Sequence, residues 1–315
     1  MKILFIPLNL IKNKFESVNC FKFLTSCLVD EFEKMGVECC SVQSVRYDKK
    51  TNSLYYNWGD FPTDVDATIY SACSFRNDFK KIKELTKKPL FSLLDVPMQG
   101  VDWAFYFAGS NKNVKPNTTL ISCPVHKQMC KNIPKKKKII IDHYLKPDRD
   151  MWGINSIVKT KEKTDLTYEI SEWLTELKDE YEIIRKTGFN KINKAVFFEK
   201  DTIKPHEKIL FKCSMEKYLK ETDDADVYIA THYESCGYEI PEAAARGIRV
   251  FAPKNFLCPD FVEKLGIKTF KNKEELIKLI KTPRENYWNN NINNCTDYSE
   301  VAKIIINKIK ELNRC

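Results

Sequence analysis

Two glutamates, Glu234 and Glu242, stand eight residues apart in a segment that could bind a phosphate-bearing ligand. Gly237 lies between them, and Pro241 followed by a run of alanines predicts a short helix with Glu242 in its first turn. Backbone N–H groups at the start of a helix favour an anion, and a glycine lets the backbone approach a phosphate closely. Glu242 could accept hydrogen bonds from paired hydroxyls. The chemistry indicated is therefore binding of a phosphorylated sugar such as a nucleotide.

This segment resembles the signature of retaining GT-B glycosyltransferases. Their pattern is commonly E-G-F-G-x-P-x-x-E-A-x-A-x-G-x-P-V, after a strand that ends in a small hydroxyl residue. Here the run from Glu234 is ESCGYEIPEAAARGIRV, and Thr231 is the small hydroxyl residue. The resemblance covers about 30 residues of the chain, and the order of the surrounding elements also fits.

The segment departs from the family pattern at several positions. Ser235 stands where the family usually has glycine, and Arg249 stands where it usually has proline. The proline inside the loop is displaced to Pro241, and Glu239 adds a third carboxylate.

The resemblance implies roles for individual residues. Glu242 would hold the ribose of a sugar donor, and the backbone amides of Gly237 and Tyr238 would hold its diphosphate. Glu234 would contact the sugar and support an oxocarbenium-like transition state, which makes it the catalytic candidate. Further donor-binding candidates in the same segment are Ser235 and His232.

The family offsets the diphosphate charge with fixed cations, so neither a metal ion nor another cofactor is expected. Lys146 and Arg149 are the candidates, because their loop leaves the carboxyl end of a predicted strand, where ligands bind. Candidates for contact with the acceptor or the sugar are Asp95, His126 and His143.

The elements that must position these residues alternate between strands and helices, which predicts an α/β fold with parallel sheets. Strands are predicted at 2–7, 37–43, 67–72, 89–95, 118–123, 138–145, 182–188, 193–199, 226–232 and 248–253. Helices are predicted at 21–35, 80–87, 165–181, 215–225, 241–247, 273–281 and 299–312. The strand at 226–232 is uncharged after Asp226, so we expect it to be central and buried on both faces.

Two such alternations predict two facing Rossmann-like domains with a cleft between them, the GT-B arrangement. The polar, basic stretch 132–138 contains a proline and marks the boundary. We expect an acceptor-binding domain at 1–133 and a nucleotide-sugar-binding domain at 134–296. The helix within 297–315 is expected to pack back on the N-terminal domain.

The composition is that of a globular protein, with 43% hydrophobic and 30% charged residues. No apolar run approaches the roughly 20 residues that span a bilayer, so no membrane span is expected. The twelve cysteines are scattered without a C-x-x-C pair, which favours free thiols in a reducing cytosol over disulfides or zinc. The nearest candidate for a zinc site is the set Cys123, His126 and Cys130.

The function expected from this combination is transfer of a sugar from a UDP-sugar to an acceptor hydroxyl. The formal charge of +9 and a Lys- and Asn-rich composition of phage or viral type favour a hydroxymethylated base in DNA as acceptor. A saccharide or glycan acceptor is the alternative within the same family. An epimerase or hydrolase that acts on the nucleotide-sugar itself is also compatible with the motif, and so is a non-catalytic nucleotide or nucleic-acid binding module. The sequence predicts neither the sugar nor the oligomeric state.

Overall fold

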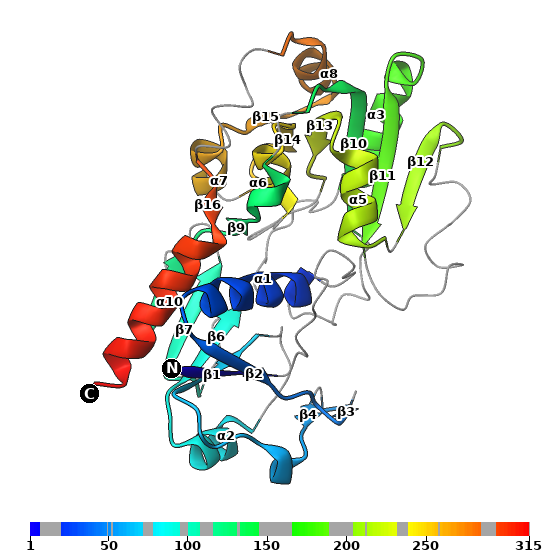
Figure 1. Ribbon diagram of the computed structural model, residues 1–315. Coiled ribbons are helices and arrows are strands. Elements are labelled where there is room, and N and C mark those ends of the chain that lie inside the picture. The colour runs from blue at the N-terminus through cyan, green and yellow to red at the C-terminus, as the bar shows by residue number, and fades with distance from the viewer. Residues whose placement is uncertain are drawn as a thin grey trace. The chain divides into compact units, whose positions relative to one another are not determined.

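In the computed structural model, the helices and strands form two compact α/β units (Figure 1). Unit 1 comprises Met1–His126 and Thr296–Cys315, and unit 2 comprises Lys127–Cys295. The predicted boundary between residues 133 and 134 lies inside unit 2. The structure describes residues 1–6, 20–48, 50–51, 53–71, 78–94, 100–107, 116–130, 133–144, 166–188, 204–211, 213–231, 239–257, 259–284 and 294–314.

Unit 1 contains a six-stranded sheet of order β2-β1-β5-β6-β7-β8 in which all neighbours are parallel. The strands are β1 (Lys2–Ile6), β2 (Glu38–Ser41), β5 (Ala67–Tyr70), β6 (Leu90–Leu94), β7 (Trp103–Phe107) and β8 (Thr118–Ile121). Residues 3–6 of β1 are fully buried. This burial explains the unbroken apolar run at the start of the sequence, because a strand covered on both faces has no polar side.

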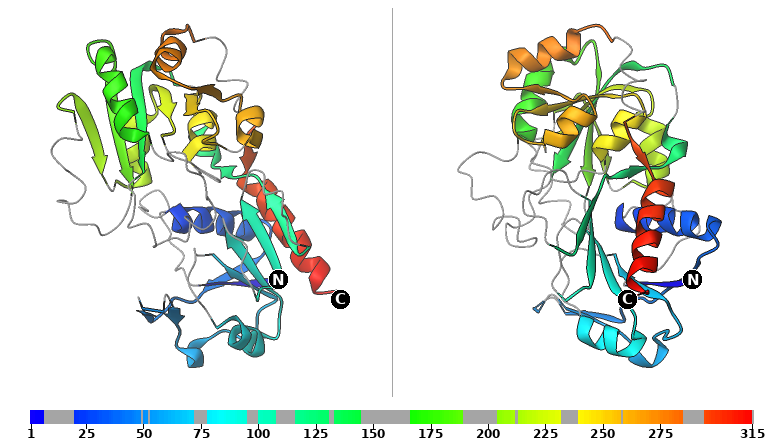
Figure 2. Two further views of the ribbon diagram at one scale, coloured as in Figure 1. Left: turned by 180° about the vertical axis from the view of Figure 1, so that it is seen from behind. Right: turned by 90° about the vertical axis from the view of Figure 1, so that its left-hand side faces the viewer.

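Different helices cover the two faces of this sheet. They are α1 (Cys20–Lys34), α2 (Phe79–Thr86) and α10 (Tyr298–Leu312). Side chains alternate between faces along β1, so Phe5 meets Phe32 of α1 with ring centroids 6.0 Å apart, whereas Ile6 shares an apolar cluster with Phe79 of α2. The C-terminal helix α10 packs beside α1 (Figure 2).

The C-terminal helix is also tied to unit 1 through its first residues. β16 (Thr296–Asp297) pairs in parallel with β9 (Pro124–Val125). Asp297 then caps α10, because its side chain accepts a hydrogen bond from the backbone N–H of Glu300 at 2.9 Å.

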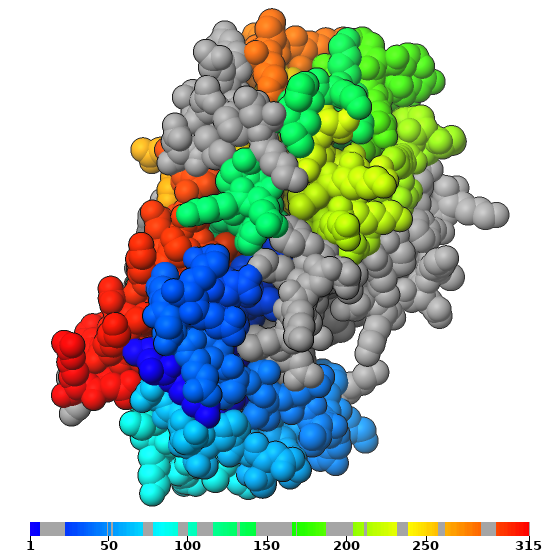
Figure 3. All heavy atoms as spheres, in the orientation of Figure 1, coloured from blue at the N-terminus to red at the C-terminus, as the bar shows by residue number. Residues whose placement is uncertain are grey.

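A hairpin that was not predicted from the sequence follows β2. Its strands, β3 (Arg46–Asp48) and β4 (Ser53–Tyr55), are antiparallel, and the segment lies on the surface in Figure 3 (blue, lower right). The guanidinium of Arg46 lies 4.2 Å from the ring centre of Tyr55. The segment continues through the short 3-10 helix η2 (Trp58–Asp60) and contributes Tyr56 and Phe61 to the core on the α2 face.

Unit 2 contains a second six-stranded parallel sheet, of order β12-β11-β10-β13-β14-β15. The strands are β10 (Lys136–Tyr144), β11 (Glu182–Gly188), β12 (Glu207–Phe211), β13 (Ala225–Ile229), β14 (Arg249–Pro253) and β15 (Lys268–Phe270). β13 lies between β10 and β14, and its residues 227–229 are fully buried. The prediction of a central strand covered on both faces is therefore confirmed.

The helices of unit 2 cover opposite faces of its sheet. They are α3 (Thr167–Leu174), α5 (Met215–Thr222), α6 (Glu239–Ala245), α7 (Pro259–Lys264) and α8 (Lys273–Lys281), with 3-10 turns η3 (Lys127–Met129) and η5 (Thr175–Leu177). Ile183 packs in the large cluster under α3 and α8, whereas Ile184 packs under α5 with Leu210 and Tyr218. Each fully buried isoleucine contributes about 2 kcal/mol from the area removed from water.

Most predicted elements are confirmed, with changes at their ends. The helix predicted at 165–181 is shorter, because α3 ends at Leu174 and continues as η5. The helix predicted to begin at Pro241 begins at Glu239, which places the proline in the first turn, where its missing N–H has no intrahelical partner to lose. The predicted strand 193–199 lies outside the described residues. Among the described helices, none is both long and apolar enough to span a membrane.

Candidate functional site

Because all strands of unit 2 are parallel, their carboxyl ends lie at one edge of the sheet, where α/β proteins bind ligands. Thr231, just beyond β13, connects three elements at this edge. Its carbonyl accepts from the N–H of Leu166 at 2.8 Å, and its hydroxyl lies 2.8 Å from that of Thr167 at the start of α3. The same hydroxyl donates to the carbonyl of Asp142 in β10. The small hydroxyl residue of the motif therefore fixes the edge of the sheet from which the loop to α6 departs.

Glu242 lies in the first turn of α6 and is only 4% exposed. Its backbone carbonyl accepts from the N–H of Arg246 at 3.1 Å. Within the described residues, no group donates a hydrogen bond to its side-chain carboxylate. Burial removes most of the solvation of this carboxylate and no hydrogen bond from a described residue replaces it, so a ligand that donates hydrogen bonds would stabilise it.

The electrostatics of Glu242 reflect this burial. Burial raises the pKa of Glu242 to about 7, and the positive charges of Arg246 and Lys186 offset part of the rise. The carboxyl therefore exchanges its proton near neutral pH. Such displaced pKa values gather at functional sites more often than elsewhere.

A second carboxylate, Glu239, lies at the start of α6 and is paired. Lys186 of β11 forms an ion pair with it, and the Tyr228 hydroxyl donates to its Oε2 at 3.2 Å. The Lys186 ammonium also lies 4.8 Å from the ring centre of Tyr218 in α5. The Lys186 side chain is 14% exposed and that of Glu239 is 34% exposed. One cation thus lies near two carboxylates at the ligand-binding edge.

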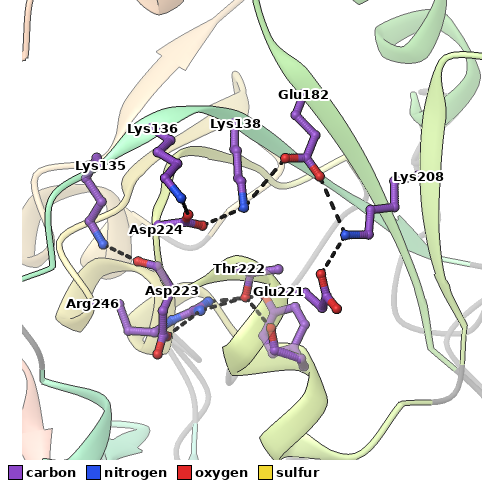
Figure 4. A network of polar contacts seen from close by, with 11 residues as sticks. Lys135, Lys136, Lys138, Glu182, Lys208, Glu221, Thr222, Asp223, Asp224 and Arg246 are labelled. Atoms are coloured by element: carbon purple, nitrogen blue, oxygen red, sulfur yellow. Dashed lines mark hydrogen bonds and ion pairs between the residues drawn. The ribbon is translucent and has the colours of Figure 1, made fainter.

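Arg246 holds the far end of α6 against α5 (Figure 4). It is 1% exposed. Its Nη1 donates to the Thr222 hydroxyl at 2.8 Å and to Asp223 at 3.2 Å, and its Nη2 donates to the Tyr218 hydroxyl at 3.2 Å. These bonds fix the position of α6 on the sheet, and hence the position of Glu242.

The opposite edge of the sheet, where the strands begin, carries an ion-pair network (Figure 4). Asp224, before β13, pairs with Lys136 at 2.9 Å and with Lys138 at 2.7 Å. Lys208 pairs with Glu221 of α5 at 2.5 Å, and the outer side of α5 lies on the surface in Figure 3 (yellow-green). This network joins α5 to the strand starts and lies away from the ligand-binding edge, so its role is structural.

Lys135, in the same network, is expected to react with acylating reagents faster than its neighbour Lys136. Its ammonium donates to the Asp223 carbonyl at 2.5 Å, and burial together with the charges of Arg246 and Arg284 lowers its pKa from 10.5 to about 8. About half of Lys135 is therefore neutral at pH 8, whereas Asp224 raises the pKa of Lys136. Limiting acetic anhydride followed by peptide mass spectrometry measures the two rates. Equal acetylation of both lysines at pH 8 would contradict the assignment.

The structure describes three of the predicted site residues, Glu242, His143 and His126. Glu242 is described, and the structure brings it close to Lys186. His143 lies in β10 opposite Thr187 of β11, and His126 of unit 1 lies between Phe23 and Tyr298, with ring centroids 6.4 and 6.2 Å away. The predicted residues outside the described part of the chain are Asp95, Lys146, Arg149, His232, Glu234, Ser235, Gly237 and Tyr238.

Sequence reasoning missed Lys186 as a site residue and left Glu239 without a role. A signal was present, because a strand that packs against helices on both faces rarely carries Arg185 and Lys186 in succession without partners. The sequence of the strand does not show which residues those partners are.

The zinc interpretation finds no support in the described residues, where no group of three or more His, Cys, Asp or Glu side chains could hold a metal ion. Cys123 and His126 belong to unit 1, whereas Cys130 belongs to unit 2. Cys123 and Cys130 form no disulfide bond.

Solved structures with a similar fold include several glycosyltransferases. An alpha-glucosyltransferase in complex with UDP and a 13-mer DNA is 12% identical, with a TM-score of 0.64 over 98% of this chain and 99% of that one. A glycosyltransferase of avilamycin A biosynthesis is 11% identical, with a TM-score of 0.62 over 99% and 98%. Sucrose-phosphate synthase from Thermosynechococcus elongatus is 9% identical, with a TM-score of 0.63 over 99% and 98%. The expected fold class, two Rossmann-like α/β units of the GT-B type, is confirmed.

Comparisons of the sequence alone gave no such relatives. No family model matches the chain, and no curated protein matches it. The similarity between this chain and the glycosyltransferases is therefore a similarity of fold.

Proposed function

We propose that the protein is a glycosyltransferase that uses a UDP-sugar as donor, without a metal ion and with retention of the anomeric configuration. The observation that carries the proposal is Glu242, a buried carboxylate at the ligand-binding edge of a GT-B fold, to which no described residue donates a hydrogen bond. Two adjacent ribose hydroxyls would supply the missing hydrogen bonds. Solved structures of similar fold contain UDP with glucose or UDP with DNA, which supports the choice of donor.

The remaining roles in the donor site are assigned by the resemblance. The Gly237 and Tyr238 amides would bind the diphosphate, with Ser235 and His232 beside it, and Lys146 or Arg149 would offset its charge. Glu234 would contact the sugar. Fixed hydrogen-bond donors and cations that stabilise the departing diphosphate would supply most of the rate enhancement.

A hydroxymethylated base in DNA is the acceptor that we favour. The chain carries a formal charge of +9, which favours a polyanion, and two structures of similar fold are alpha-glucosyltransferases in complex with DNA. A base in duplex DNA would have to leave the stack before its hydroxyl could react. Asp95, His126 and His143 are the proposed contacts with acceptor or sugar. A saccharide acceptor is the second candidate, because similar folds include sucrose-phosphate synthase.

The test is a transfer assay with a panel of UDP-sugars and duplex DNA that contains 5-hydroxymethylcytosine, 5-hydroxymethyluracil or only unmodified bases. We expect a hexosylated nucleoside from one hydroxymethylated duplex, none from the unmodified duplex, and an unchanged rate when EDTA is added. Digestion to nucleosides and mass spectrometry detects the product, and NMR of its anomeric proton reports the configuration. Turnover with saccharides and with none of the duplexes would favour a saccharide as the acceptor. UDP binding without any turnover would indicate a non-catalytic module.

A further inference from the structure

The ion pair between Lys186 and Glu239 joins the carboxyl end of β11 to the start of α6. Lys186 is two residues before the end of β11, and Glu239 is the first residue of α6. Both therefore lie at the edge of the sheet where Thr231 holds the strand ends. The pair is not part of the network at the opposite edge, where the strands begin (Figure 4).

Lys186 is held in place by groups on other elements. Its side chain is 14% exposed and lies over the Tyr218 ring of α5, a contact that favours a cation at this position. Among the described residues, Glu239 is the carboxylate with which its ammonium forms an ion pair. A lysine this buried needs an anion, because the charged form otherwise loses its hydration without compensation.

The two partners of the pair are not equally fixed. Glu239 is 34% exposed, against 14% for Lys186, and it receives one further hydrogen bond, from the Tyr228 hydroxyl. Its carboxylate could therefore turn to solvent at small cost, whereas the ammonium would stay in place. The buried carboxylate of Glu242 is close enough for the Lys186 charge to influence its pKa, so the ammonium acts on two carboxylates of α6.

We propose that Lys186 is a donor-binding cation that Glu239 occupies in the free protein and that the diphosphate of the nucleotide takes over on binding. The inference rests on the proposed function and adds a residue that the family resemblance does not supply. A diphosphate carries more negative charge than one carboxylate and offers several acceptor oxygens, so it displaces Glu239 from the ammonium. No covalent bond changes in this exchange.

The proposal predicts opposite effects for the two partners. Lys186→Met is expected to weaken UDP binding about 10- to 100-fold, the usual effect of a lost charge-assisted hydrogen bond. UMP, which lacks the second phosphate, is expected to lose less. Glu239→Gln is expected to tighten UDP binding several-fold, because the internal competitor for the ammonium is removed. Lys186→Arg is expected to restore part of the affinity.

The experiment is calorimetric titration of wild type and variants with UDP and with UMP, and the readout is the ratio of the two dissociation constants. Lys136→Met is the matched control, since Lys136 pairs with an aspartate at the opposite edge, and its ratio is expected to equal that of wild type. Thermal unfolding verifies that each variant is folded. Should Lys186→Met not fold, Glu239→Gln still tests the exchange.

The outcomes separate this inference from the proposed function. If wild type binds neither nucleotide, the proposed function fails and the inference falls with it. If wild type binds UDP but Lys186→Met loses UDP and UMP affinity equally, Lys186 only supports the fold and the inference alone is wrong. Glu239→Gln with unchanged or weaker UDP affinity would also overturn it.

Discussion

Glu242→Gln is expected to weaken UDP binding about 10- to 100-fold while making the protein more stable above pH 7. The binding loss follows because glutamine has the shape of glutamate but lacks the charge that strengthens hydrogen bonds to the ribose hydroxyls. Calorimetric titration with UDP at pH 8 measures it. A single substitution would thus separate the affinity of the site from the stability of the fold.

The gain in stability follows from the raised pKa of Glu242, about 7 against an ordinary 4.5. Between these two values the folded protein holds a proton that the unfolded chain has released. The free energy of unfolding therefore falls as the pH rises from about 4.5 to 7, and it stays lower above pH 7. The loss amounts to about 3 kcal/mol, and glutamine, which does not titrate, avoids it. Urea unfolding of both proteins is expected to show a difference of about 1 kcal/mol at pH 5 and about 3 kcal/mol at pH 8.

Glu182→Gln is the control for both measurements, because Glu182 is a partly exposed carboxylate at the opposite edge of the same sheet. Glu182→Gln is expected to change the UDP affinity and the pH dependence of unfolding much less than Glu242→Gln does. A Glu242→Gln variant that binds UDP like wild type would contradict the donor site. Equal stability of wild type and Glu242→Gln at both pH values would contradict the burial of an ionisable carboxyl.

Arg249→Ala is expected to destabilise unit 2 by about 3–5 kcal/mol, the range for removing one partner of a buried ion pair. Arg249 is 5% exposed and binds Asp226 through Nε at 3.2 Å and Nη2 at 2.5 Å. It also donates to the carbonyls at the end of α8, those of Leu279, Ile280 and Thr282. The substitution would leave the partly buried Asp226 carboxylate with Arg284 as its remaining ion-pair partner among the described residues, and the last turn of α8 without the Arg249 donor groups. Urea unfolding monitored by circular dichroism measures the loss.

Substitutions of two further arginines serve as comparisons for this prediction. Arg284 shares Asp226 at 2.9 Å but is 25% exposed, so Arg284→Ala is expected to cost less than Arg249→Ala. Arg46→Ala removes a surface guanidinium and is expected to change the free energy of unfolding by about 0.5 kcal/mol or less. If Arg249→Ala unfolds at the same urea concentration as Arg46→Ala, Arg249 does not anchor α8.

The sequence predicted the repeating α/β pattern because that pattern is local. The apolar run of β1 and the amphipathic spacing of α10 are visible within a few residues, and both elements are confirmed. β7 was missed although its sequence, WAFYF, is a short apolar run of the kind that forms buried strands. The hairpin of β3 and β4 was missed because its strands have three residues each, too few to show an alternation.

The candidate site could be predicted only in part, for a different physical reason. Glu242 was found because glycine and proline mark its loop and helix in the sequence. The burial of Arg246 and Arg249 was not, since each depends on an aspartate 23 residues earlier in the chain. Arg249 was noted only as a replacement for the proline usual in the family, and the structure shows its contribution to packing. Lys186 and Glu239 are farther apart still, and only the fold brings them together.

A crystal structure of the protein with UDP would show directly where the nucleotide binds relative to Glu242. We expect both ribose hydroxyls within hydrogen-bond distance of the Glu242 carboxylate, with the diphosphate at the start of α6. UDP bound elsewhere on the protein, or a Glu242 carboxylate that stays without a donor while UDP is present, would contradict it.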